Sequence, residues 1–237
     1  SADMKGGLAS MLGAIKAINE SELKLKGDLV FQAVIDEERG GHKGTRRLLL
    51  EKGIVGDFAI VGEPTNLEVQ IAHKGDLGVE ITTRGRAAHA ATPQEGINAI
   101  QKMNAIINEL LTIHQRFNWE RKRHGLVGTP TLNLSVINGG LQRNMVPDFC
   151  RLVVDRRVVP GLETLEDVRK EIEFILKEAM EKDPQLSVEM GTMLEIEAAE
   201  VSRGEKIVEM LVGAYEKALR KEAVISGLVA FSDMHWL

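Results

Sequence analysis

Apolar and polar positions follow two different periods along the chain, and the change lies near residue 75. Just after Gly6-Gly7, apolar residues recur at spacings of three and four: Leu8, Met11, Leu12, Ile15 and Ile18. This spacing predicts an amphipathic helix with one buried face. The runs 29–35 and 58–61 are short and almost wholly apolar, which is typical of strands buried on both faces of a parallel sheet. With a further helix expected at about 43–52, residues 1–74 are predicted to form an α/β unit with a mostly parallel sheet.

From residue 75 the pattern is that of a separate α+β domain. Residues 77–83 alternate apolar and polar side chains, which indicates a strand in a sheet with one solvent-facing side. The elements predicted after it are a helix at 97–111, strands at 131–137 and 149–154, a helix at 165–179 and a strand at 186–196. We place this domain at 75–193. Residues 194–237, with a helix at 207–218 and a strand at 224–230, are expected to complete the first domain.

Composition narrows the protein class. The 237 residues are 43% hydrophobic and 27% charged, with a formal net charge of −5, which is typical of a globular protein and gives no support to nucleic-acid binding. No apolar run is long enough to span a bilayer, and the N-terminus lacks the pattern of a signal peptide. A single cysteine, Cys150, cannot form an intrachain disulfide. We therefore expect a cytoplasmic protein without a membrane partner.

Carboxylates follow both apolar runs. Glu37 and Glu38 come after the first run and Glu63 after the second, and the carboxyl ends of parallel strands share one edge of a sheet. Crowded carboxylates are costly unless a cation offsets their charge, so a divalent metal site is one interpretation. The other is that these acids are solvated loop residues, which is the commoner case for a single Glu. Asp3, just before the first helix, could be a helix N-cap, a metal ligand, or both.

A series of motifs along the chain resembles one enzyme family. The motifs are Ala2-Asp3-Met4-Lys5-Gly6-Gly7, Asp36-Glu37-Glu38, Gly62-Glu63-Pro64, Gly85-Arg86-Ala87-Ala88-His89, Asn138-Gly139-Gly140, Asn144-Met145-Val146-Pro147 and Asp155-Arg156-Arg157. Their order and spacing resemble the co-catalytic zinc family that contains acetylornithine deacetylase, succinyl-diaminopimelate desuccinylase, aminoacylase and glutamate carboxypeptidase. The resemblance implies a zinc-exopeptidase-like α/β catalytic domain with an inserted α+β lid and dimerisation domain.

The resemblance also implies roles for the acids of the first domain. Asp3 would bridge two zinc ions, Glu38 would bind one and Glu63 the other. Glu37 would be the general base. Two metal ions lower the pKa of a shared water and polarise the scissile carbonyl, so that a nearby carboxylate can relay the proton.

Three further residues take implied roles in the lid domain. His89 resembles the histidine that stabilises the developing oxyanion, usually across a dimer interface, and a homodimer through the lid is expected. Asn144 and Arg156 resemble the pair that holds the substrate's carboxylate. Without the motifs, His89 would be interpreted as a surface or packing residue, and Arg156 as part of a charged strand edge.

The sequence also departs from the family pattern. The family has a His-x-Asp segment before the Asp3 position and a histidine ligand near its C-terminus, and this sequence has neither. We therefore expect it to be part of a longer protein and to bind zinc poorly, because three carboxylates without imidazole favour harder cations; cobalt or manganese could substitute. The predicted function is metal-dependent hydrolysis of the amide bond of an N-acyl amino acid. The alternatives are a dipeptidase or carboxypeptidase of the same family, and a non-catalytic dimeric binding protein.

Overall fold

The computed structural model describes residues 2–120 and 123–237. The chain divides into two compact units, one formed by residues 1–73 together with 199–237 and the other by residues 74–198. Helices are present in both, but no helix within the described ranges has the length and apolar character needed to cross a membrane.

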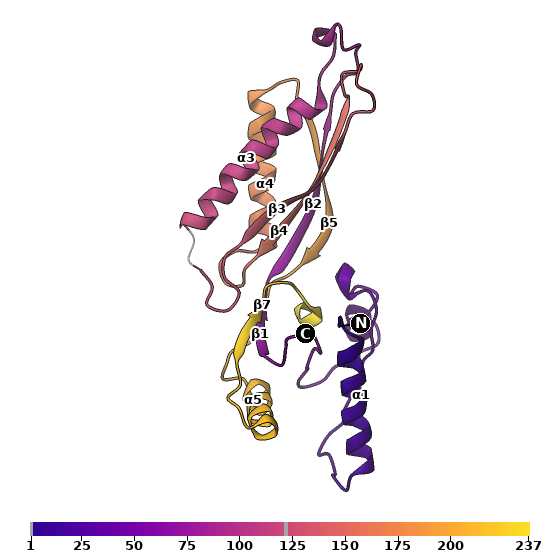
Figure 1. Cartoon of the computed structure of the whole chain (residues 1–237), viewed down its shortest axis with the longest axis vertical. Helices are drawn as coiled ribbons and strands as arrows, with labels where there is room; N and C mark the ends of the chain where they lie inside the picture. The colour runs from indigo at the N-terminus through magenta and orange to yellow at the C-terminus, as the bar shows by residue number, and fades with distance from the viewer. Residues whose placement is uncertain (1, 121–122) are drawn as a thin grey trace. The chain divides into compact units, whose positions relative to one another are not determined.

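The second unit is an antiparallel sheet with two helices on one face (Figure 1). Its strands are β2 (Gly75–Arg84), β3 (Thr131–Gly139), β4 (Phe149–Val158) and β5 (Ser187–Ile196), in the order β3-β4-β2-β5. Helices α3 (Ala99–Glu120) and α4 (Leu165–Lys182) contact each other and strands β2 and β4. A short 3-10 helix, η2 (Pro93–Glu95), precedes α3.

Strand alternation explains how this unit builds its core. In β2, Leu77, Val79 and Ile81 are fully buried, and they pair in register with Arg156, Val154 and Leu152 of β4. Alternate residues of a strand point to opposite faces of the sheet, so the side chains of these residues all lie on the face that the helices cover. The helices supply the matching apolar stripe, which includes Met103, Ile106, Leu110, Val168 and Ile172. Helix α4 begins with a capping box in which Thr164 and Asp167 bond each other's backbone N–H.

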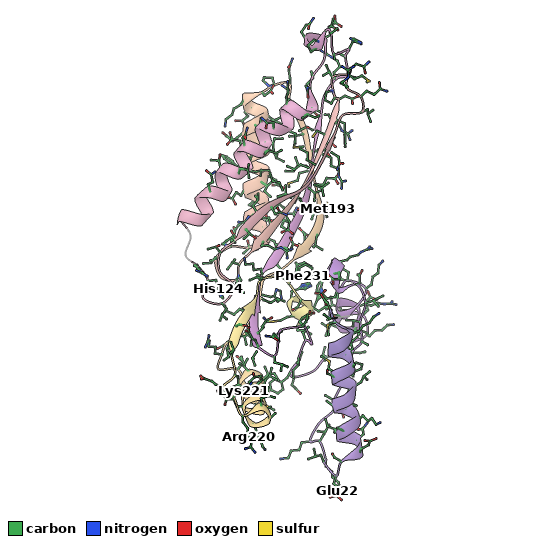
Figure 2. All side chains as sticks on the ribbon, in the orientation of Figure 1. Glu22, His124, Met193, Arg220, Lys221 and Phe231 are labelled. Atoms are coloured by element: carbon green, nitrogen blue, oxygen red, sulfur yellow. The ribbon has the colours of Figure 1, made fainter. Side chains whose placement is uncertain are left out.

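The first unit contains a small sheet and several helices. Its sheet has the order β6-β1-β7, from β1 (Val69–His73), β6 (Ala199–Glu200) and β7 (Ile225–Leu228). Its helices are α1 (Lys5–Glu20), η1 (Glu37–Arg39), α2 (Thr45–Leu50), α5 (Lys206–Leu219) and η3 (Asp233–Trp236). Helix α5 packs on β1 and ends at Leu219, just before Arg220 (Figure 2). Arg220 has a φ of 53° and caps the helix in the left-handed region.

Most predicted helices and strands are confirmed, but the described residues do not form the mostly parallel sheet that the sequence predicts. The runs 29–35 and 58–61 pair with no strand among the described residues, and Val30 and Ile60 are 55% and 59% exposed. A strand forms only where a neighbouring strand pairs with its backbone through hydrogen bonds, and an apolar sequence alone does not provide that neighbour. Across both sheets, the described strand pairs are antiparallel except β1 with β7.

The predicted domain limit at 193 also needs correction. Strand β5 continues to Ile196, which is fully buried and pairs with Asp76 of β2. Cutting the chain at 193 would divide a strand whose ladder continues. The second unit therefore extends to residue 198.

Candidate functional site

The predicted acids Asp3, Glu37, Glu38 and Glu63 all lie in the first unit. Asp3 precedes α1, Glu37 and Glu38 lie in η1, and Glu63 lies in the loop before β1. Asp3 is not an N-cap: that position is Met4, which makes no side-chain capping hydrogen bond.

Close backbone contact joins the first turn of α1 to the loop that carries Glu63. A Cβ atom added at Gly7 would lie 2.4 Å from the carbonyl oxygen of Gly62, and one added at Gly62 would lie 2.1 Å from the terminal methyl carbon of Met11. Only glycine fits the contact at Gly7, where the neighbouring atom belongs to the backbone, whereas the contact at Gly62 is with the end of a flexible side chain. The Gly-Gly motif after Asp3 and the Gly-Glu-Pro motif are thus next to each other in the structure, although they are far apart in sequence.

The loop that carries Glu37 begins with an unusual backbone conformation. Asp36 has a φ of 75°, which is uncommon for a residue other than glycine. Its carbonyl oxygen accepts hydrogen bonds from the N–H groups of Arg39 and Gly41, and its Oδ2 accepts one from the N–H of Lys43 at 3.1 Å. Asp and Asn tolerate this region because their side chains bond nearby backbone groups. The turn places Glu37 and Glu38 at the start of η1.

Burial and neighbouring carboxylates change the acidity of this site. The pKa of Glu37 is raised to about 8, chiefly by burial and then by negative charge on Glu63, Asp233, Glu38 and Asp3, in that order of effect. Burial likewise raises the pKa of Glu63 to about 7, with contributions from Asp3, Asp233 and Glu38. Both shifts have the same physical origin: half-buried carboxylates that repel one another resist ionisation.

The donor set of the first unit fits a divalent cation in charge and in chemistry. Oxygen donors suit hard divalent cations, and a positive charge would offset the repulsion that raises the pKa of Glu37 and Glu63. In their present positions, however, no three His, Cys, Asp or Glu side chains of the described chain are grouped closely enough to hold a metal ion.

His89 and Asn144 lie in the second unit and are brought together there. His89 forms an antiparallel bridge with Met145, and the N–H of Ala90 donates to the carbonyl oxygen of Asn144 at 3.0 Å. The Nδ1 atom of His89 accepts a hydrogen bond from the N–H of Ala91 at 3.1 Å. Neutral His89 therefore carries its proton on Nε2, which leaves an exposed N–H donor.

Arg156 occupies a position at odds with the role predicted for it. Its side chain is 1% exposed, and its two terminal nitrogens donate to the two oxygens of Glu163 at 2.9 and 2.8 Å. Alternation along β4 turns Arg156 toward the helices and Arg157 to the other face, where Arg157 pairs with Asp155 and Asp76. A substrate carboxylate would have to displace Glu163 from Arg156.

Asp233 is the acid that the motif reasoning did not select. It is 5% exposed, and its charge contributes to the raised pKa of both Glu37 and Glu63. The only sequence signal for Asp233 is its position after an apolar strand, in the run Ser232-Asp233. That signal is weak, because 170 residues separate Asp233 from Glu63 and nothing local shows that the two lie close together.

Comparison with known proteins places these features in a family. Residues 71–184 match the model of the M20 peptidase dimerisation domain. The chain is 38% identical over 168 residues to an acetylornithine deacetylase of Proteus mirabilis, covering 70% of this chain and 42% of that protein. It is 31% identical to an acetylornithine deacetylase of Buchnera aphidicola over 211 residues, covering 88% of this chain and 54% of that protein. The chain thus spans about half the length of these relatives.

A solved structure supports the fold over the whole chain. The aminopeptidase PepT of Bacillus cereus aligns with a TM-score of 0.69 at 21% identity, covering 100% of this chain and 60% of that one. The matched dimerisation domain and the acetylornithine deacetylase relatives together show that the chain belongs to the M20 peptidase family.

Proposed function

We propose that this protein is a metal-dependent hydrolase of the amide bond in N-acyl amino acids. The observation that carries the proposal is the set of mutually repelling carboxylates around Glu37. Its likeness to acetylornithine deacetylases at 31 and 38% identity favours a deacylase over a peptidase.

Asp3, Glu38 and Glu63 would hold two divalent metal ions, which the family resemblance identifies as zinc and for which cobalt or manganese could substitute; without the two histidine ligands, this chain would bind zinc weakly. The chemistry that such a cation supplies is polarisation of the scissile carbonyl and acidification of the attacking water. Glu37 would accept the proton of that water and deliver it to the leaving amine. A carboxyl whose pKa is near the working pH can both take up and release a proton, and burial brings Glu37 into this range.

His89 and Asn144 would act on the substrate from the lid domain. The Nε2–H of His89 is available to donate to the oxyanion, because Nδ1 is already occupied by the Ala91 N–H. The exposed amide of Asn144 would bind the substrate near its carboxylate. Arg156 is left out of this assignment because Glu163 already neutralises it.

A second copy of the chain would pair along the β3 edge of the lid domain. β3 lies at one end of the sheet, and Val136 and Ile137 on it are 46% and 54% exposed. The opposite edge, β5, exposes Met193 (Figure 2). It also carries the charged side chains of Glu189 and Glu195, which oppose strand pairing. An apolar, unpaired edge is suited to a symmetric partner that presents the same edge.

Hydrolysis of a panel of N-acetyl amino acids and dipeptides tests the proposal, with metal content measured by mass spectrometry. Glu37→Gln should lower kcat by about 10²–10⁴-fold and leave the metal content unchanged. Glu38→Ala and Glu63→Ala should lose metal. Glu51→Gln, an exposed acid on the same unit, is the control and should behave as wild type.

Each other outcome has a definite meaning. Ordinary turnover by Glu37→Gln would show that the base is a different residue. Cleavage of dipeptides alone would make the protein a peptidase, and absence of both metal and turnover would favour a non-catalytic binding protein.

A further inference from the structure

A hydrogen bond joins two parts of the first unit that are 188 residues apart in sequence. The hydroxyl of Thr45, the first residue of α2, donates to Oδ2 of Asp233 in η3 at 2.6 Å. Both residues are buried, each 5% exposed. A buried carboxylate is stable only where donors replace water, so this bond ties η3 to the start of α2.

η3 also contacts the loop between Glu37 and Thr45. The indole Nε1–H of Trp236 donates to the carbonyl oxygen of Gly40 at 2.8 Å, and the Trp236 ring lies edge-on to His42 at 5.4 Å. At Gly41, which has a φ of 65°, an added Cβ would lie 2.1 Å from Oδ1 of Asp233. The loop therefore follows the surface of η3 along its length.

The same loop is hydrogen-bonded internally as far as Glu37. The N–H of Gly40 donates to the carbonyl oxygen of Glu37, and that of Gly41 to the carbonyl oxygen of Asp36, both at 2.8 Å. A displacement of the Thr45 end would thus pass through successive hydrogen bonds to the residue that we assign as the base.

We propose that Asp233 is a positioning residue that, through Thr45, fixes the loop 36–45 and with it the carboxylate of Glu37. The role of Glu37 in this inference rests on the proposed function. The mechanical link between Asp233 and the loop does not depend on it, and the two are tested separately.

Hydrogen–deuterium exchange of the purified protein tests the link. Thr45→Val keeps the shape of the side chain and removes the donor, and it should speed amide exchange in peptides covering 36–45 and 232–237 by at least about tenfold. Thr45→Ser keeps the hydroxyl and should restore slow exchange. The control is Ser226→Ala, which removes an equally short hydroxyl–carboxylate bond, to Glu68 at 2.6 Å, in the sheet of the same unit.

Steady-state kinetics of the same variants test the positioning role. Thr45→Val should lower kcat by at least about tenfold while KM and metal content stay unchanged, and Thr45→Ser should recover the rate. Faster loop exchange with an unchanged kcat would overturn the positioning role, and unchanged exchange would overturn the link itself. If Thr45→Val does not fold, Trp236→Phe takes its place with the same expected results, because it removes the bond to Gly40 and part of the ring that contacts His42. If wild type shows no turnover on any substrate, the proposed function fails while exchange still decides the link.

Discussion

The buried pair Arg156–Glu163 allows a decisive test of what Arg156 does. Glu163→Gln keeps the size of the side chain but removes the negative charge opposite a guanidinium that is 1% exposed. Removing one partner of a buried ion pair costs roughly 3–5 kcal/mol, because the other charge is left without compensation. For a unit of this size, that loss corresponds to a fall in Tm of about 10–20 °C.

A double-mutant cycle separates a packing role from a substrate-binding role. Arg156→Met and Glu163→Leu, each made alone, should destabilise the protein about as much as Glu163→Gln. The variant with both changes, Arg156→Met with Glu163→Leu, should recover most of the loss, because two apolar side chains can replace a buried pair. Urea unfolding followed by circular dichroism gives the free energies, and hydrogen exchange assigns the transition to residues 74–198.

Additive losses in the double variant, or a Glu163→Gln protein as stable as wild type, would refute this reasoning. A Glu163→Gln protein with unchanged stability but a much higher KM would restore the substrate-binding role predicted for Arg156.

Three further predictions concern the lid domain. Burial raises the pKa of Asp76 to about 6, so the native state binds more protons than the unfolded state between about pH 4 and 6. The free energy of unfolding should therefore fall by about 3 kcal/mol as the pH rises through that window. Asp76→Asn should remove this fall from urea midpoints measured at pH 4–7, and parallel curves would contradict it. Ile137→Glu on the β3 edge should convert a dimer to a monomer in size-exclusion chromatography, whereas Met193→Glu on the β5 edge, where Met193 is exposed to a similar degree (55%), should not. Thr164→Ala, which removes the α4 capping box, should cost about 1 kcal/mol in urea unfolding, and a loss below about 0.3 kcal/mol would contradict the cap.

Hydrophobic periodicity was sufficient to predict the helices and strands that bury one face and expose the other. The alternation in β2 and β4 and the apolar stripes of α3 and α4 are local signals, and the structure confirms all four elements. Strand alternation also indicates that Arg156 and Arg157 point to opposite faces of the sheet. The motif resemblance selected Arg156 without regard to that alternation.

Sequence alone could not determine which segments pair. The runs 29–35 and 58–61 have the composition of buried strands, yet pairing requires a neighbour at hydrogen-bonding distance, which composition does not encode.

The sequence by itself determined the family, through motifs whose order and spacing are preserved along the chain, and it named the acids Asp3, Glu37, Glu38 and Glu63. Only the tertiary structure decided how these acids affect one another, because the raised pKa of Glu37 depends on burial and on charges that come from distant segments. It alone also revealed Asp233, whose hydrogen bond to Thr45 spans 188 residues. A local sequence pattern indicates whether a side chain is buried or exposed, whereas a contact between distant segments exists only after the chain has folded.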